Sequence, residues 1–201
     1  SKPIVSHFGK YAKSVFDEFL KNDTNPLVVE IGSNDGSLLK EFKKLGVSVL
    51  GIEPASNLAK LSNDLNIDTL NEFFSLEIAK QITESKTPSV IVANNVIGHI
   101  ENLHNLMDGI KLLIGKSGVF IFEVPYLIDL IKNLELDTVY HEHLSYFSLL
   151  PLVSWIEQFG LEIFEKYILK LKKLSQSFQK KQLKSMHIYK LVQQMIILKP
   201  I

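Results

Sequence analysis

Short apolar runs alternate with helix-spaced segments along most of this chain, and this alternation points to the α/β class of folds. The apolar runs occupy residues 27–31, 47–52, 67–70, 89–93 and 118–124. Neighbouring parallel strands need crossover connections, which helices supply, so the alternation predicts repeated βα units. Most residues of these runs are apolar, as is typical of strands covered on both faces. We therefore predict a Rossmann-like, doubly wound α/β fold over residues 1–165, with a mostly parallel sheet and helices on both faces.

The segments between these runs show the spacing of amphipathic helices. Apolar side chains recur every three or four positions, which predicts helices over residues 6–20, 37–45, 54–65, 76–82 and 103–114. Further helices are expected at 126–134 and 149–159, and residues 161–164 are a candidate sixth strand. Residues 166–201 form a Lys-rich tail with loose helical spacing and little turn chemistry. We expect this tail to be helical or poorly ordered.

A glycine-containing loop follows the first predicted strand. Residues 28–36 read Val-Val-Glu-Ile-Gly-Ser-Asn-Asp-Gly, and a helix is expected directly after them. Glycine is favoured where a ligand approaches the backbone closely or where φ is positive. The helix that follows offers free backbone amides to a polar or anionic group. For either glycine taken alone, a tight strand–helix turn without a ligand is the competing explanation.

An acidic residue, Glu53, ends the second predicted strand, 21 residues after Gly32. A carboxylate at this place can accept hydrogen bonds from both hydroxyl groups of an adenosine ribose. The loop at 32–36 is not a G-x-G-x-x-G sequence, so the usual dinucleotide fingerprint is missing. Together, the loop and Glu53 predict a nucleotide site at the carboxyl edge of the sheet.

The run Glu30-Ile31-Gly32-Ser33-Asn34-Asp35-Gly36, followed by Ile52-Glu53-Pro54, resembles the class I methyltransferases that use S-adenosylmethionine. In that family the glycine loop cradles the methionine part of the cofactor, and the acid after the second strand holds the ribose. Asn34 stands where the commonest family loop has its middle glycine. The resemblance assigns cofactor binding to a set of loop residues: Glu30, Gly32, Ser33, Asn34, Gly36, Glu53, Pro54 and Asn94.

A second stretch, at residues 140–148, reads Tyr-His-Glu-His-Leu-Ser-Tyr-Phe-Ser and follows Phe-Glu-Val-Pro-Tyr at 122–126. The run Ala-Asn-Asn-Val-Ile-Gly-His-Ile at 93–100 adds polar groups after the fourth strand. Together these segments resemble the sugar C-methyltransferases that act on nucleotide-linked keto-deoxyhexoses. The resemblance covers residues 8–164, and the Tyr-x-Glu-His stretch is its most specific part. It implies a nucleotide-linked sugar as substrate.

Carbon methylation needs a carbanion equivalent, which forms when a proton leaves the carbon beside a ketone. Histidine suits that task because its pKa lies near neutrality, and the enolate oxygen needs nearby hydrogen-bond donors. By the resemblance, His143 is the base, and Tyr140 and Glu142 orient or polarise the sugar. His99 and Asn95 are expected to contact the substrate from the loop after the fourth strand.

Competing explanations exist for several of these residues. His141, Glu142 and His143 could ligate a metal ion, but alternate residues of an extended chain face opposite ways and the spacing is not H-E-x-x-H. We therefore expect no metal site. His104 and His187 are expected at the surface or in helix packing. A small-molecule O-methyltransferase and a non-catalytic domain that binds a nucleotide or a partner are the alternative functions.

Charge and composition exclude several further classes. All 22 basic residues are lysine, and cysteine is absent, which removes disulfide scaffolds and thiol nucleophiles. Residues 1–160 carry a net charge of −7 and residues 161–201 one of +7. With no arginine and no ordered aromatic pattern, the basic tail does not predict nucleic-acid binding. No apolar run reaches the roughly 18 residues of a membrane span and no secretory pattern is present, which favours a cytoplasmic protein.

The resemblance also suggests that the chain is the central part of a longer enzyme. Members of the sugar C-methyltransferase family usually carry an N-terminal zinc-binding domain built on cysteine pairs and a C-terminal domain. Neither pattern occurs in these 201 residues, and the Lys-rich tail does not resemble the family. The sequence leaves the oligomeric state, the sugar and the methylated carbon open.

Overall fold

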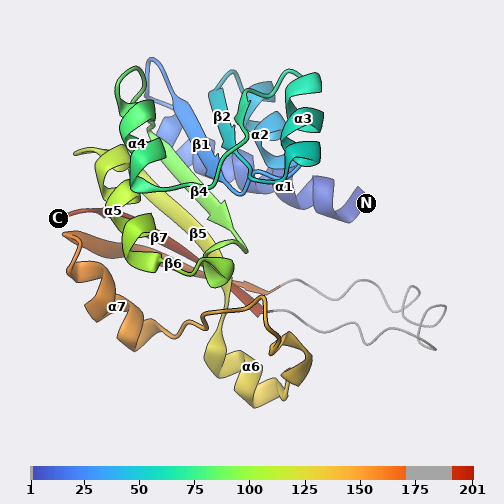
Figure 1. The fold of residues 1–201 in the computed structure, drawn as a ribbon, viewed down its shortest axis with the longest axis vertical. Helices are drawn as coiled ribbons and strands as arrows, with labels where there is room; N and C mark the ends of the chain where they lie inside the picture. The colour runs from blue at the N-terminus through green and yellow to red at the C-terminus, as the bar shows by residue number, and fades with distance from the viewer. Residues whose placement is uncertain (1, 171–191) are drawn as a thin grey trace.

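The computed structural model describes residues 2–170 and 192–201, and these form an α/β structure (Figure 1). Its strands are β1 (Leu27–Ile31), β2 (Ser48–Ile52), β3 (Thr69–Leu70), β4 (Val90–Asn94), β5 (Val119–Pro125), β6 (Leu161–Lys170) and β7 (Val192–Pro200). Its α-helices are α1 (Lys2–Val15), α2 (Ser37–Lys44), α3 (Ser56–Asp64), α4 (Leu76–Thr83), α5 (Leu103–Ile114), α6 (Leu127–Asn133) and α7 (Leu149–Glu157). A π-helical turn, η1 (Phe16–Leu20), continues α1, and 3₁₀ turns lie at η2 (Ile97–His99) and η3 (Leu136–Thr138).

The strands pair in the order β3-β2-β1-β4-β5-β7-β6. The first five are parallel, with β1 against β2 and β4, β4 against β5, and β2 against β3. Strand β7 runs antiparallel between β5 and β6. Because the parallel strands end at one edge, the loops after β1, β2, β4 and β5 gather there. The predicted doubly wound, mostly parallel fold is confirmed.

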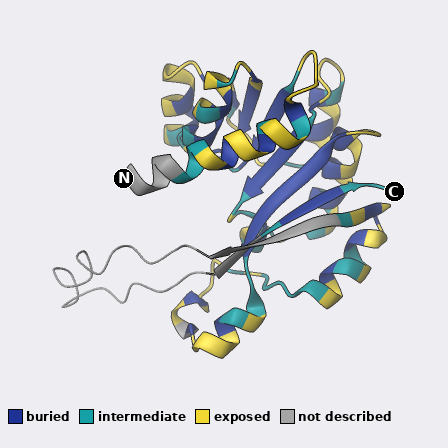
Figure 2. Ribbon diagram, turned by 180° about the vertical axis from the view of Figure 1, so that it is seen from behind, coloured by how far each residue is buried: buried dark blue, intermediate teal, exposed yellow. Residues whose placement is uncertain are grey.

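Helices cover both faces of the sheet and build two apolar cores. One core contains side chains of α4, α5 and α7, and the other contains side chains of α1 and α2. Figure 2 shows α1 lying across its face of the sheet, with the strands beneath it buried. Because both faces are covered, continuous apolar runs such as residues 90–93 of β4 have partners on each side.

The prediction for the Lys-rich tail, residues 166–201, is wrong wherever the structure describes it. Strand β6 continues to Lys170 and β7 spans Val192–Pro200, while residues 171–191 lie outside the described residues. Ile196 and Leu198 enter the core of α5, and Ile197 enters that of α1. The apolar run at 195–198 has only four residues, and so short a run has no period that separates strand from helix. The edge of β5 favours a strand here, because its backbone N–H and C=O groups need hydrogen-bond partners, which β7 supplies.

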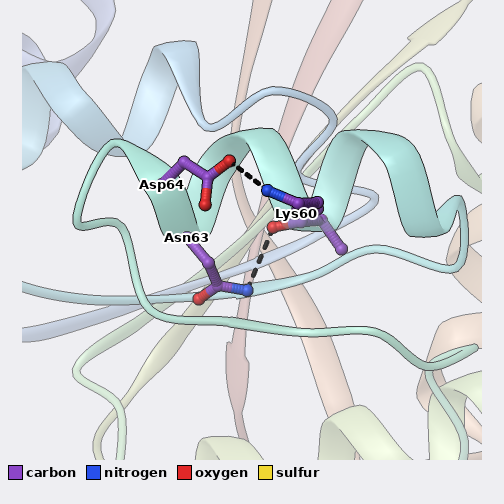
Figure 3. A network of polar contacts seen from close by, with 4 residues as sticks. Lys60, Asn63 and Asp64 are labelled. Carbon is purple, nitrogen blue, oxygen red and sulfur yellow. Dashed lines mark hydrogen bonds and ion pairs between the residues drawn. The ribbon is translucent and has the colours of Figure 1, made fainter.

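Helix α3 is linked to β3 by a side-chain amide. Asn63 Nδ2 donates to the carbonyl oxygen of Ala59 at 3.0 Å and to that of Thr69 at 2.9 Å, and the Thr69 amide donates to Asn63 Oδ1 at 3.0 Å. Figure 3 shows the first of these bonds beside the Lys60–Asp64 ion pair on the same helix. The link holds Ser62 and Ile67 against Gly36, where an added Cβ would lie 2.5 Å from Ser62 Oγ. The packing of α3 therefore shapes the glycine loop.

Replacing Leu198 with Ala tests the position of β7. This side chain is fully buried, so its truncation should lower the free energy of unfolding by about 2–5 kcal/mol in urea denaturation. Ile201→Ala is the matched control, because Ile201 is 80% exposed and its loss should change stability by less than about 0.5 kcal/mol. Equal, small effects for both variants would contradict a buried β7.

Candidate functional site

The residues expected to bind a cofactor lie at the carboxyl edge of β1, β2 and β4. Glu30 is the penultimate residue of β1, Glu53 follows β2, and Asn94 ends β4. The loop between β1 and α2 carries the others: Gly32, Ser33, Asn34 and Gly36. Strand register explains this clustering, since Glu30 pairs with Gly51 of β2 and with Val92 of β4.

The glycine loop has the backbone that its sequence suggests. Gly32 and Gly36 have φ values of +69° and +73°, and Asn34 has φ +53°, a region that asparagine tolerates better than most residues. A Cβ on Gly32 would lie 2.4 Å from Cγ2 of Val96, in the segment after β4. Both features exclude side chains at Gly32. The loop therefore brings its backbone close to the end of β4.

The Glu53 carboxylate ties two loops together. Its Oε2 accepts a hydrogen bond from the Asn34 amide at 2.9 Å, and its Oε1 accepts one from the Ala55 amide at 2.8 Å. Each carboxylate oxygen can accept a second hydrogen bond, so two sites are left for ligand hydroxyl groups. The next residue, Pro54, is partly exposed, and its carbonyl oxygen accepts from Asn71 Nδ2 at 2.9 Å.

The Ser33 side chain lies against β2. A Cβ built on Gly51 would fall 2.4 Å from Ser33 Oγ, and among the described residues this buried hydroxyl has no hydrogen-bond partner. The Ser33 amide donates to the carbonyl oxygen of Ile52 at 3.2 Å. The Ser33 side chain therefore leaves room only for glycine at position 51. Cofactor contact by Ser33 stays a prediction.

Two carboxyl groups are buried near this edge, Glu30 in β1 and Glu123 in β5. Glu30 is 5% exposed and Glu123 is 3% exposed. Burial raises the pKa of Glu30 well above its usual value, and the charges of Asp35 and Glu53 raise it further. Burial raises the pKa of Glu123 from 4.5 to about 7. Burial therefore favours the protonated form of both groups.

Residues of α1 cover these carboxyl groups. Tyr11 donates its hydroxyl to Asn94 Oδ1 at 3.4 Å, and Nε2 of His7 lies 3.9 Å from Glu123 Oε1. Burial, followed by the charges of Glu123 and Glu30, raises the pKa of Tyr11 well above its usual value. Sequence reasoning missed Glu123, Tyr11 and His7 as site residues. The sequence did contain a signal for Glu123, because it is the one charged residue in an otherwise apolar strand.

A small, partly open pocket lies beyond the ends of β4 and β5. It is lined by residues from three places, the loop after β4, the end of β5, and the chain between η3 and α7. These are Asn95, Gly98, His99, Val124, Pro125, Leu130, Thr138, His143, Ser145, Tyr146 and Phe147. Asn95, His99 and His143 had been expected to act together, and the structure brings them into one cavity.

Backbone hydrogen bonds hold the two histidines of this pocket side by side. The amides of Leu144 and Ser145 both donate to the Gly98 carbonyl oxygen, at 2.8 and 3.1 Å. The His99 and His143 rings consequently lie with their centroids 4.8 Å apart. A Cβ on Gly98 would meet the Ser145 carbonyl oxygen at 3.3 Å, so glycine favours this close approach.

The hydrogen bonds of His143 fix which of its nitrogens carries the proton. Nδ1 lies 2.7 Å from the Thr138 carbonyl oxygen, which only accepts, so Nδ1 carries the proton. In the neutral ring, Nε2 then holds the lone pair, 3.4 Å from the Tyr140 hydroxyl. The Tyr140 and His143 ring centroids are 4.3 Å apart. This geometry suits a general base that acts through Nε2.

Glu142 differs from its predicted role in one respect. Its side chain is 63% exposed and lies 4.0 Å from Nε2 of the exposed His141, outside the pocket. Its backbone carbonyl oxygen instead lies 2.9 Å from His99 Nδ1, which fixes the proton of His99 on that nitrogen. Within residues 2–170 and 192–201, no cluster of three or more side chains suited to a metal ion is found. No helix of the described chain is long and apolar enough to cross a membrane.

The carboxyl edge fits S-adenosylmethionine on three independent observations. Glu53 has remaining acceptor sites for ribose hydroxyls, and Gly32 carries no side chain into the loop, since Val96 and a positive φ both disfavour one. The buried Oε2 of Glu30 has no hydrogen-bond partner among the described residues, as expected for an atom that meets a ligand. These residues would hold the ribose and the methionine part of the cofactor.

Replacing Gly32 with Ala tests whether the loop between β1 and α2 binds the cofactor. The added methyl group meets Val96 and strains a positive φ, so we expect at least about a tenfold loss of cofactor affinity in calorimetric titration. Gly46→Ala is the control, since Gly46 also has a positive φ of +80° but open space around its Cβ position. Unchanged affinity in the Gly32 variant would contradict a role of this loop in cofactor binding.

The raised pKa of Glu123 predicts a pH-dependent stability. Between pH 4.5 and about 7 the unfolded state loses this proton and the folded state keeps it, so the free energy of unfolding falls as pH rises. Glu123→Gln removes this slope and should stabilise the protein at pH 8 by about 3 kcal/mol at most. Urea denaturation at pH 5 and 8 measures the difference. The exposed Glu157→Gln is the control, and parallel pH profiles for all three proteins would refute the prediction.

Comparison with known proteins agrees with this geometry. Residues 6–166 match the model of a family described as a methyltransferase domain. The C-methyltransferase NovU of Streptomyces niveus is 36% identical over 161 residues, which are 80% of this chain and 38% of NovU. The chain therefore spans well under half the length of that relative.

Solved structures share the fold at low sequence identity. The CcbJ methyltransferase from Streptomyces caelestis superposes with a TM-score of 0.67 at 12% identity, over 96% of this chain and 89% of its own. Magnesium protoporphyrin IX methyltransferase from Synechocystis PCC 6803, solved with bound SAH, gives 0.59 at 12% identity, over 94% and 81%. The family match, together with the cradle at Gly32 and Glu53, leads to one conclusion: this chain belongs to the S-adenosylmethionine-dependent methyltransferases.

Proposed function

We propose that this chain methylates a carbon atom next to the ketone of a nucleotide-linked keto-deoxysugar. The observation that carries the proposal is the imidazole of His143, which lines the pocket: its Nδ1 is held by the Thr138 carbonyl oxygen, and its Nε2 has the lone pair, 3.4 Å from the Tyr140 hydroxyl. The 36% identity to a protein named as a C-methyltransferase supports the same reaction type. A nucleotide-linked substrate also favours a cytoplasmic location.

His143 acts as the base in this proposal. Its Nε2 accepts the proton from the carbon beside the ketone, while Nδ1 keeps its own proton on the Thr138 carbonyl oxygen at 2.7 Å. The resulting imidazolium is stabilised by that same carbonyl oxygen. Tyr146 also donates its hydroxyl to this oxygen at 3.1 Å, which fixes the position of the acceptor.

Donors around His143 stabilise the enolate oxygen. Tyr140 has its hydroxyl 3.4 Å from His143 Nε2, close enough to contact the same substrate atoms. Asn95 and His99 line the opposite side of the pocket on the loop after β4. A neutral His99 has its Nδ1 proton on the Glu142 carbonyl oxygen, so its protonated form would be needed to donate through Nε2. Asn95 and Tyr140 are therefore the more suitable donors.

S-adenosylmethionine, when bound, supplies a methyl group on a positively charged sulfur. The residues of this chain contribute by fixing the carbanion and by holding the proton that it loses. The pocket borders the cofactor edge directly, because Asn94 and Asn95 are consecutive at the end of β4. Such juxtaposition of two reactants accounts for a large share of the rate enhancement in group transfer.

Replacing His143 with Ala tests the base. Methyl transfer to a nucleotide-linked keto-deoxyhexose should slow by about 100-fold or more, and cofactor affinity should change less than about twofold. His141→Ala is the matched control, since its side chain is 90% exposed and two residues away. Transfer is measured by mass spectrometry of the sugar nucleotide.

Deuterium exchange measures proton removal by the base separately from methyl transfer. In D₂O the unmodified chain should exchange the proton beside the ketone without cofactor, and the His143→Ala variant should not. Exchange that persists in the variant would refute His143 as base. A product methylated on a hydroxyl oxygen would overturn carbon methylation and favour an O-methyltransferase.

A further inference from the structure

The proposed base, His143, follows a stretch of chain that is exposed. Residues 139–142, directly before it, are all exposed. Thr138, the residue before this stretch, is buried. The His143 ring reaches back to it, with Nδ1 2.7 Å from the Thr138 carbonyl oxygen. Thr138 is therefore the fixed point from which the orientation of the ring is set.

The Thr138 side chain closes the 3₁₀ turn η3. Its hydroxyl Oγ1 donates to the Glu135 carbonyl oxygen at 2.7 Å, and its amide donates to the same oxygen at 3.3 Å. Amide hydrogen bonds normally measure about 2.7–3.2 Å, so the amide bond is long. The hydroxyl therefore supplies the stronger closure of this turn.

The residue that accepts these two bonds is itself held in place. Glu135 is 4% exposed, and its amide donates to the carbonyl oxygen of Leu130 in α6 at 3.0 Å. Its Oε1 also accepts a hydrogen bond from Asn133 Nδ2 at 2.9 Å. These contacts tie Glu135 to α6, so the hydroxyl bond holds the Thr138 carbonyl group at a fixed place relative to that helix.

The position of the Thr138 carbonyl oxygen decides which tautomer His143 adopts. The oxygen accepts from two donors, His143 Nδ1 at 2.7 Å and the Tyr146 hydroxyl at 3.1 Å. While the oxygen faces Nδ1, that nitrogen carries the proton and Nε2 holds the lone pair. If the carbonyl group turned away, both tautomers of the neutral ring would form. In one of them Nε2 carries the proton and cannot accept another.

We propose that the Thr138 hydroxyl positions the base: by closing η3, it keeps His143 in the tautomer whose Nε2 can accept a proton. The inference rests on the proposed function, in which Nε2 removes the proton beside the ketone. In this role Thr138 exchanges no proton with the substrate and acts only through His143. Its side chain should therefore affect the rate of proton removal and leave cofactor binding unchanged.

A threonine elsewhere in the chain makes the same local bond and provides a matched control. Thr83 Oγ1 donates to the carbonyl oxygen of Lys80, three residues earlier in α4, at 2.8 Å. Thr83 does not line the pocket. Thr138→Val and Thr83→Val each lose one hydroxyl bond of this kind. A purely structural role of Thr138 predicts the same consequences for both variants, whereas a positioning role predicts an effect on His143 for Thr138→Val alone.

Nuclear magnetic resonance of the histidine ring nitrogens tests the proposal without a substrate. In long-range ¹H–¹⁵N spectra at pH 8, His143 should show the single tautomer protonated at Nδ1 in the unmodified chain, in Thr138→Ser and in Thr83→Val. Thr138→Val should give a mixture of both tautomers. Thr138→Ala removes the hydroxyl without placing a methyl group against the Glu135 carbonyl oxygen, and it should give the same mixture. A single Nδ1-protonated tautomer in both the Val and the Ala variant would overturn the proposal.

Kinetics separate this role from that of the base itself. With a nucleotide-linked keto-deoxyhexose in D₂O, Thr138→Val should slow exchange of the proton beside the ketone about tenfold, less than the loss of about 100-fold or more expected for His143→Ala. Thr138→Ser should restore the rate to within about twofold, and S-adenosylhomocysteine should bind every Thr138 variant equally. Unchanged exchange in Thr138→Val, or no rescue by serine, would overturn the proposal. Because the ring spectra need no sugar, a failure of carbon methylation is seen separately from a failure of tautomer control.

Discussion

The parallel register of β1, β2, β4 and β5 is the constraint on which the site depends. It places the last residues of four strands at one edge, although they lie nearly a hundred positions apart in sequence. The Glu53 carboxylate then joins the loops after β1 and β2 through the amides of Asn34 and Ala55. A rigid edge of this kind holds ligand contacts without relying on flexible segments.

The fold was largely predictable from hydrophobic periodicity, with one informative failure. Helix α5 has the predicted bounds, 103–114, because its apolar stripe is long and strongly periodic. Strand β7 was missed, because the apolar run at 195–198 is too short to show any period. Its conformation is set by the edges of β5 and β6, which are tertiary features. The π-helical turn after Val15 likewise has no local signal.

Site residues were predictable where they directly follow a strand, and unpredictable where they depend on contacts between segments far apart in sequence. The loop at Gly32 and the acid at Glu53 are adjacent to their own strands, so their places follow from the βα pattern. Residue spacing alone could not show that the Gly98 carbonyl oxygen accepts hydrogen bonds from two backbone amides. These bonds place the His143 ring beside the His99 ring. The contact between His7 of α1 and Glu123 was equally hidden, because side-chain contacts between a helix and a strand 116 residues away follow from packing.

The insertion of β7 between β5 and β6 also bears on the order of folding. Strand β5 carries Phe120 and Phe122, and one of its edges is unpaired until residues 192–200 have been synthesised. An open, apolar edge of this kind can pair with other chains, and long-range strand pairing forms slowly. During translation, the segment that closes the sheet is thus also the one that protects the nascent chain from aggregation.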